Sequence, residues 1–337
     1  TLTLQTTFKY VILTLKADNK GEGGIFSLYA LVRRRKKWLV IPAMIGGAAL
    51  LADGIITPPI TVTSAIEGLR QIPAFHSITQ QTIVTIVIAI ISLLFFVQQF
   101  GTASIGKLFG PIMMVWFGMI AILGFTHLLD DIAIIKAFNP YYGVKLLATY
   151  PKGFWLLGAV FLCTTGAEAL YSDLGHCGKG NIRISWIFVK TCLIINYLGQ
   201  GAWLLAQYKG QIIPAAVMAD GFNPFIGIMP QWFKLIGIII AAAAAIIASQ
   251  ALISGSFTLI SEAMRLNLWP KMKINYPTEE KGQLYIPGIS FLLFTKYTMA
   301  VFKLSPNNNT NNCTLARNMA YIPFPSGPNN RVINIPE

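Results

Sequence analysis

Long apolar runs constrain this chain more than any other feature of its sequence. A helix needs roughly 20 apolar residues to cross a bilayer, and the runs approach or exceed that length. We predict a partial span over 2–15, a weaker one over 285–303, and full spans between them at 39–58, 81–98, 108–129, 154–172, 184–206 and 233–261. The fold class expected from this pattern is an all-α polytopic membrane protein.

Composition supports the same class. Hydrophobic residues make up 54% of the 337 residues and charged residues 12%, roughly half the usual share for a soluble domain. A soluble core cannot hide so much apolar surface, so the surrounding medium is expected to be lipid. The net charge of +13 would suit nucleic acid, but the basic residues are not interleaved with aromatic residues on a soluble scaffold. We therefore expect no nucleic-acid partner.

The basic residues also predict an orientation. If the run Arg33–Lys37 lies in the cytoplasm and successive loops alternate sides, most loop lysines and arginines fall on the cytoplasmic side. This asymmetry is the usual signature of cytoplasmic loops.

Both ends of the sequence differ from the middle. The chain opens inside an apolar segment without an initiator Met, and we interpret this as a missing N-terminus. Residues 305–337 are rich in Asn and Pro without helical periodicity, which predicts a polar, disordered tail. We therefore assign residues 1–304 to a transmembrane domain.

One acidic residue stands inside the span 39–58. An acid at the middle of a membrane helix costs roughly 2.5–3.5 kcal/mol, so it is by default a functional candidate. Helical spacing places Asp53, Thr57, Thr61 and Ser64 on one face. Such a column offers hard oxygen ligands of the kind that replace the water shell of a dehydrated alkali cation.

Two prolines follow Asp53 on the same span. Pro58 and Pro59 cannot donate backbone hydrogen bonds, so we expect free carbonyl groups one turn earlier, around Gly54 and Ile55. The plainer alternative is a kinked helix whose threonine hydroxyls bond their own i−4 carbonyls while Asp53 faces a water-filled vestibule. The sequence leaves this choice open for the threonines and favours the functional interpretation for Asp53.

A second acid interrupts the span 154–172. Thr165 and Glu168 are three residues apart and share a helix face, and Gly166 between them permits a break or a close helix approach. A discontinuous helix at membrane depth with an acid beside the break is typical of a transporter ion site. The alternative is an acid near a helix end that faces water.

Further polar positions lie nearer the predicted membrane surfaces. Asp18 and Glu22, together with three glycines, interrupt the first span at its cytoplasmic end; they form either a gate or a re-entrant turn. His76 and His127 fall at predicted outer ends, where solvation at the interface is the ordinary explanation.

Seven strings, in order over about residues 5–295, carry a family resemblance: "KADNKGEGGIFSLYALVRR", "ADGIITPPITVTSAIEGL", "GTASIGKLFGPIMMVWF", "NPYYGVKLL", "GAVFLCTTGAEALYSDLGHCGKGNIRISW", "YLGQGAWLL" and "KGQLYIPGIS". Together they resemble the KUP/HAK/KT family of potassium uptake permeases. The potassium ion is implied by this resemblance and not by composition.

The resemblance implies a twelve-helix protein of the amino acid–polyamine–organocation (LeuT-like) type, with inverted repeats and discontinuous first and sixth helices. This chain would hold a partial transporter bundle, helices two to nine. On the family pattern, the acid of the third helix falls on Asp53, with hydroxyls at Thr57 and Thr61, and the sixth-helix pair falls on Thr165 and Glu168.

The implied activity is potassium uptake across the plasma membrane by symport with protons and alternating access, without a cofactor. Potassium would rest on oxygens of the first, third and sixth helices. Burial disfavours the charged form of a carboxyl group, so Asp53 or Glu168 is expected to carry the proton. The resemblance also implies a possible homodimer of the full-length form, joined through a cytoplasmic domain.

The chain departs from the family pattern at both ends, where the first helix and the last three are not found. We therefore also consider a non-transporting remnant and a proton-coupled amino-acid permease of the same architecture. An enzyme is the weakest interpretation, because the sequence contains no nucleophile–base pair or metal cluster that would support one.

Overall fold

The fold was analysed in a computed structural model, which describes residues 2–17, 19, 23–33, 36–100, 103–149, 153–162, 164, 166, 171, 174–208, 223–277 and 284–304. The described residues are mostly helical, and one isolated antiparallel bridge joins Asn275 to Tyr285. The predicted tail 305–337 lies outside the described residues.

Within the described part of the chain, five helices are long and apolar enough to cross a membrane: α2 (Val40–Glu67), α3 (Gln80–Gln98), α4 (Ala103–Thr126), α9 (Lys179–Tyr208) and α12 (Lys234–Arg265). The shorter helices are η1 (Leu2–Leu13), η2 (Thr14–Lys16), α1 (Ile25–Val32), η3 (Lys37–Leu39), η4 (Gly68–Gln71), η5 (Pro73–Phe75), η6 (Ile132–Phe138), α5 (Pro140–Thr149), α6 (Gly153–Leu162), α8 (Leu174–Cys177), α11 (Pro224–Gly227) and α13 (Pro287–Leu304). The prediction of an all-α membrane protein is confirmed.

The five long helices match five of the predicted spans, each with somewhat different ends. The segment 2–15 forms the short helices η1 and η2, and α1 follows the predicted interruption. The weaker span 285–303 forms α13, which is helical but is not among the five. Of the span 154–172, the structure describes α6 and then only isolated residues.

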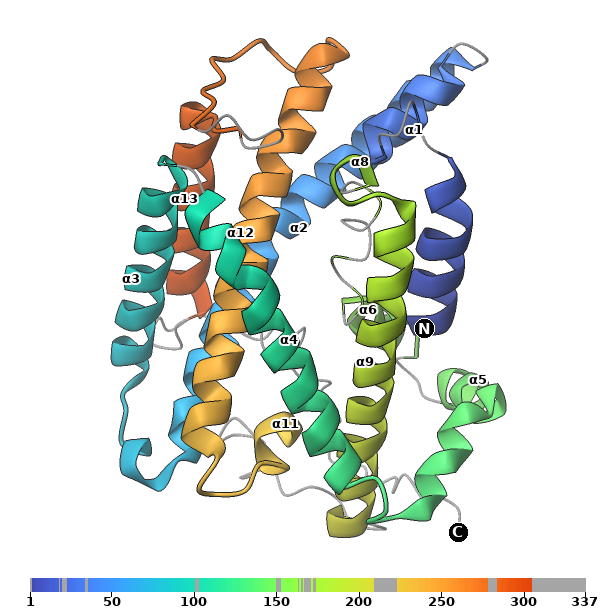
Figure 1. The fold of residues 1–337 in the computed structure, drawn as a ribbon, viewed down its shortest axis with the longest axis vertical. Coiled ribbons are helices and arrows are strands. Elements are labelled where there is room, and N and C mark those ends of the chain that lie inside the picture. The colour runs from blue at the N-terminus through green and yellow to red at the C-terminus, as the bar shows by residue number, and fades with distance from the viewer. Residues whose placement is uncertain are drawn as a thin grey trace.

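Helices α2, α4 and α9 run from the upper to the lower end of the view, and α3 and α12 run the opposite way (Figure 1). The ends of α1 and α3, the starts of α4 and α9, and the end of α12 lie at the upper end of the view. The ends of α2, α4 and α9 and the start of α12 lie at the lower end. The chain reverses from α2 to α3, from α3 to α4 and from α9 to α12, as predicted for consecutive spans. The predicted span 154–172, which would reverse the chain between α4 and α9, is described only in part. The assignment of the upper end to the cytoplasm stays a prediction.

Four clusters of buried apolar side chains hold the described helices together, and two of them involve most of the long helices. The larger core joins α2, α3, α12 and α13 through buried side chains that include Val62, Ile91, Phe257 and Leu293. The smaller core joins α4, α9 and the turn after α11 through residues that include Met119, Ile120, Leu123, Cys192 and Ile228. Because the outward faces of the same helices expose large apolar side chains such as Leu93, Ile122 and Ile184, the bundle suits a lipid environment.

Helices α4 and α9 pack with almost no space between their backbones. A Cβ atom built on Gly199 of α9 would lie 2.0 Å from the carbonyl oxygen of Gly124 in α4. Small residues permit such close approaches between membrane helices, where van der Waals contact replaces the hydrophobic effect as the driving force. The α4–α9 pair therefore depends on the absence of a side chain at these two positions.

We predict that Gly199→Ala lowers the unfolding midpoint of the purified chain in lipid nanodiscs, because the added methyl forces the two backbones apart at a cost of about 1–3 kcal/mol. The matched control is Gly118→Ala in α4, where a Cβ meets nothing within 4 Å. Since alanine is the better helix former by about 1 kcal/mol, the control should keep or raise the midpoint. Equal midpoints for the two variants would contradict the packing argument.

Candidate functional site

Asp53 lies within α2 and has two carboxylate oxygens in different situations. The hydroxyl of Thr57, one turn later, donates a hydrogen bond of 2.7 Å to Asp53 Oδ1. The other oxygen, Oδ2, is buried and accepts no hydrogen bond from any residue that the structure describes. A buried acceptor left without a partner is destabilising by about 1–3 kcal/mol. A proton or a cation bound at Oδ2 would remove this penalty.

The two threonines of the predicted column keep acceptor capacity. Thr57 donates its hydroxyl proton to Asp53, and Thr61 donates to the carbonyl oxygens of Thr57 at 3.0 Å and Pro58 at 3.1 Å. For Thr61, the plainer expectation of an i−4 backbone bond is therefore correct. A hydroxyl that donates its proton still has lone pairs, so both oxygens can also face a cation. Ser64 is exposed, and the column ends at Thr61.

The prediction of free carbonyl groups one turn before the prolines was wrong at Gly54. Helix α2 continues through Pro58 and Pro59, and both prolines are buried. The carbonyl oxygen of Gly54, which loses its i+4 donor at Pro58, accepts a hydrogen bond from the hydroxyl of Tyr297 in α13. A neighbouring helix thus satisfies the backbone group that the proline leaves without a donor.

Helix α12 covers the same turn of α2. A Cβ atom built on Gly54 would lie 2.7 Å from Oγ of Ser256, whose own hydroxyl donates to the carbonyl of Leu252 at 2.9 Å. Only a residue without a side chain permits this approach without displacing Ser256. The Asp53–Thr57 turn is therefore held between α12 and α13.

The structure also reveals buried polar groups that the sequence analysis missed. Gln98 at the end of α3 donates to Ser254 Oγ at 3.3 Å and accepts a hydrogen bond from Gln250, so the side-chain amides join α3 to α12. Both glutamines are buried. Glutamines within or at the end of apolar runs are the available signal: Gln98 ends the predicted span 81–98, and Gln250 lies inside the predicted span 233–261. Three more buried oxygens have no partner among the described residues: Thr6 Oγ1, Thr63 Oγ1 and Asn196 Oδ1.

Four predicted site residues lie outside the described residues: Asp18, Glu22, Thr165 and Glu168. Their described neighbours do meet. The hydroxyl of Tyr171 donates to the carbonyl of Ala17, and a Cβ atom on Gly23 would lie 1.9 Å from the Tyr171 carbonyl oxygen. Residues on both sides of the predicted gate therefore pack against a tyrosine three positions after Glu168.

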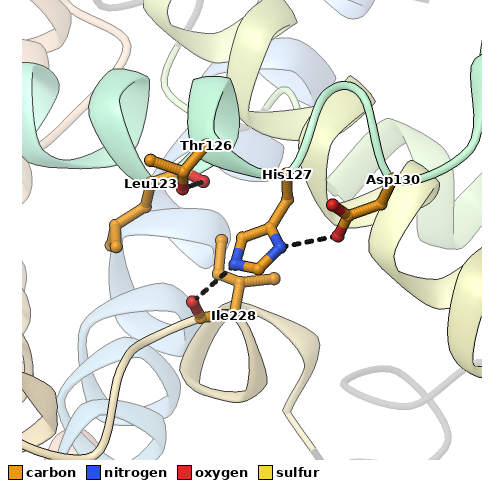
Figure 2. Close-up of polar contacts among 5 residues, drawn as sticks. All are labelled: Leu123, Thr126, His127, Asp130 and Ile228. Carbon is orange, nitrogen blue, oxygen red and sulfur yellow. Dashed lines mark hydrogen bonds and ion pairs between the residues drawn. The ribbon is translucent and has the colours of Figure 1, made fainter.

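His127 makes more specific contacts than solvation at an interface would require (Figure 2). Its Nδ1 lies 2.7 Å from Oδ2 of Asp130, and its Nε2 lies 3.0 Å from the carbonyl oxygen of Ile228. A carbonyl oxygen can only accept, so Nε2 must carry a proton. The imidazolium form, with a proton on each nitrogen, would donate to both neighbours. His127 thus ties the end of α4 to the turn that precedes α12.

We predict that His127→Phe loosens this turn, because phenylalanine keeps the ring but has no N–H to donate. Backbone amides at 228–234 should exchange with deuterium about tenfold faster, the effect of losing roughly 1.4 kcal/mol of local stability. The control is His76→Phe, because His76 is exposed, and it should leave these amides unchanged. Unchanged exchange in the His127 variant would show that the apolar core alone holds the turn.

Comparison with known proteins gives one consistent family. The sequence model of the K+ potassium transporter integral membrane domain matches residues 1–317. The probable potassium transport system protein Kup of Cytophaga hutchinsonii is 63% identical over 302 residues, which cover 87% of this chain and 44% of that protein. The corresponding protein of Clostridium perfringens is 54% identical over 314 residues, which cover 92% and 47%.

A third relative, the putative potassium transport system protein Kup 1 of Lactococcus lactis subsp. cremoris, is 56% identical over 299 residues, which cover 87% of this chain and 43% of that protein. The chain therefore spans less than half the length of these curated relatives. No solved structure matches it. The matched family is one of transporters rather than enzymes.

The family model covers nearly the whole chain, and the described helices supply several membrane spans. The resemblance noted from the sequence motifs is confirmed. This chain belongs to the K+ potassium transporter family of multi-pass membrane proteins.

Proposed function

We propose that the full-length form of this protein takes up potassium across the plasma membrane and holds the ion beside Asp53 of α2. The observation that carries this proposal is the buried Oδ2 of Asp53, which accepts no hydrogen bond among the described residues. An acid inside a membrane helix is expensive and marks ion or proton pathways. The names of the relatives, potassium transport system proteins, supply the ion.

The remaining ligands are proposed from two helices. Thr57 and Thr61 lie one and two turns after Asp53, and their oxygens keep lone pairs after donating their protons. Thr165 and Glu168 would add a hydroxyl and a second carboxylate from the segment that follows α6. Oxygen ligands of these kinds can replace the hydration shell of potassium.

Proton coupling is the second part of the proposal. Potassium would enter by symport, with Asp53 or Glu168 carrying the proton, because burial disfavours the charged form of a carboxyl group. Alternating access would follow the inverted-repeat LeuT-like arrangement. Asp18 and Glu22 would form the gate, an assignment supported by the packing of Ala17 and Gly23 against Tyr171. In the full-length form, a homodimer is the expected assembly.

The test is growth of a potassium-uptake-deficient bacterium at low external potassium. The strain would carry this chain alone, or this chain completed at both ends with sequence from the Cytophaga hutchinsonii relative. We expect rescue by the completed form. Failure of a well-expressed completed form would contradict potassium uptake, and competition of uptake by an amino acid would indicate an amino-acid permease instead. If only a shorter natural gene exists, a non-transporting remnant is the better interpretation.

We predict that Asp53→Asn abolishes proton-coupled uptake in the completed form, because the amide can neither neutralise a cation nor carry a proton. Thr57→Val should weaken the apparent potassium affinity about tenfold, the effect of about 1.4 kcal/mol, whereas Thr57→Ser keeps the hydroxyl and the affinity. The control is Ser64→Ala on the exposed part of the same helix, which should match the unmodified form. Full activity of Asp53→Asn would refute the proposed site.

A further inference from the structure

Tyr297 is a polar side chain in the middle of the larger apolar core. It is 1% exposed, and its ring packs edge-on against Phe95 of α3, with centroids 5.3 Å apart. The apolar ring explains why the residue can be buried there. Its hydroxyl group needs a partner, since buried tyrosine hydroxyls usually find one.

The partner is a backbone group that helix α2 cannot satisfy by itself. The Tyr297 hydroxyl donates to the carbonyl oxygen of Gly54. In an α-helix, this carbonyl would accept from the N–H of residue 58. Residue 58 is proline, which has no N–H. Without Tyr297, the Gly54 carbonyl would be buried in an apolar environment with one donor missing.

The turn that Tyr297 supports is the turn that carries the candidate site. Gly54 follows Asp53 directly, and Thr57 bonds Asp53 across the same turn. We propose that Tyr297 is a positioning residue for the ion site: its hydroxyl replaces the amide proton missing at Pro58 and so holds the Asp53–Thr57 turn against α13. This role rests on the proposed function, but the hydrogen-bond replacement can be tested without it.

The replacement predicts a specific dependence between two positions on different helices. Tyr297→Phe keeps the ring and its packing on Phe95 but removes the donor, so the apparent melting temperature of the full chain in nanodiscs should fall by roughly 2–4 °C. In a Pro58→Ala background, residue 58 supplies the missing N–H. The same Tyr297→Phe change should then cost little or nothing.

Pro59→Ala is the matched control, because Pro59 is the next proline and is also buried. Its missing N–H would have bonded Ile55 and not Gly54, so the Tyr297→Phe shift should stay at full size in that background. Tyr276→Phe, at an exposed position, should have no effect in any background. If Tyr297→Phe lowers the melting temperature equally in the parent chain and in the Pro58→Ala background, the proposed replacement is refuted.

The link to the ion site needs a second measurement on the completed form. Tyr297→Phe should weaken the apparent affinity for potassium several-fold while the maximal uptake rate at equal expression is kept, and Pro58→Ala should restore the affinity. A loss of maximal rate without a change in affinity would refute positioning of the site. If the completed parent takes up no potassium, the proposed function fails, while the melting experiment still decides whether Tyr297 replaces the missing donor.

Discussion

The packing of α2 between α12 and α13 is the contact on which the candidate site depends. Two features of α2 make it possible. Gly54 has no side chain, so Ser256 of α12 can approach its backbone. Pro58 has no N–H, so the Gly54 carbonyl can accept from Tyr297 of α13. Both features concern one turn, and the acid Asp53 lies beside it.

Lipid makes the pairing of polar groups decisive in this bundle. Water cannot satisfy a donor or acceptor within the bilayer core, so each such group must find a partner in the protein. The Gly54 carbonyl finds Tyr297, and the amides of Gln98 and Gln250 find each other and Ser254. Four buried oxygens have no partner among the described residues, and Asp53 Oδ2 is the one that belongs to a carboxylate. A buried acceptor without a partner calls for an explanation, and a bound ion is one.

The sequence predicted some of the contacts in the candidate site and missed others. Asp53 and Thr57 are predicted site residues because an acid and a hydroxyl four residues apart share a helix face. The structure joins them by a hydrogen bond. The expectation of a free Gly54 carbonyl failed because its donor comes from α13, more than two hundred residues later. The sequence likewise predicts a solvated His127, because its partner, the carbonyl oxygen of Ile228, lies 101 residues later in the chain.

The sequence by itself determined the membrane class, the long helices and the polar residues of α2, because these depend on local hydrophobicity and on helical periodicity. The family resemblance followed from motifs that are also local. Only the tertiary structure decided which helices cover the Asp53 turn, which side chain meets the carbonyl that Pro58 leaves unbonded, and where Gln98 and His127 find partners. These pairings join segments far apart in the chain, and spacing along one helix carries no information about which distant helix packs against it.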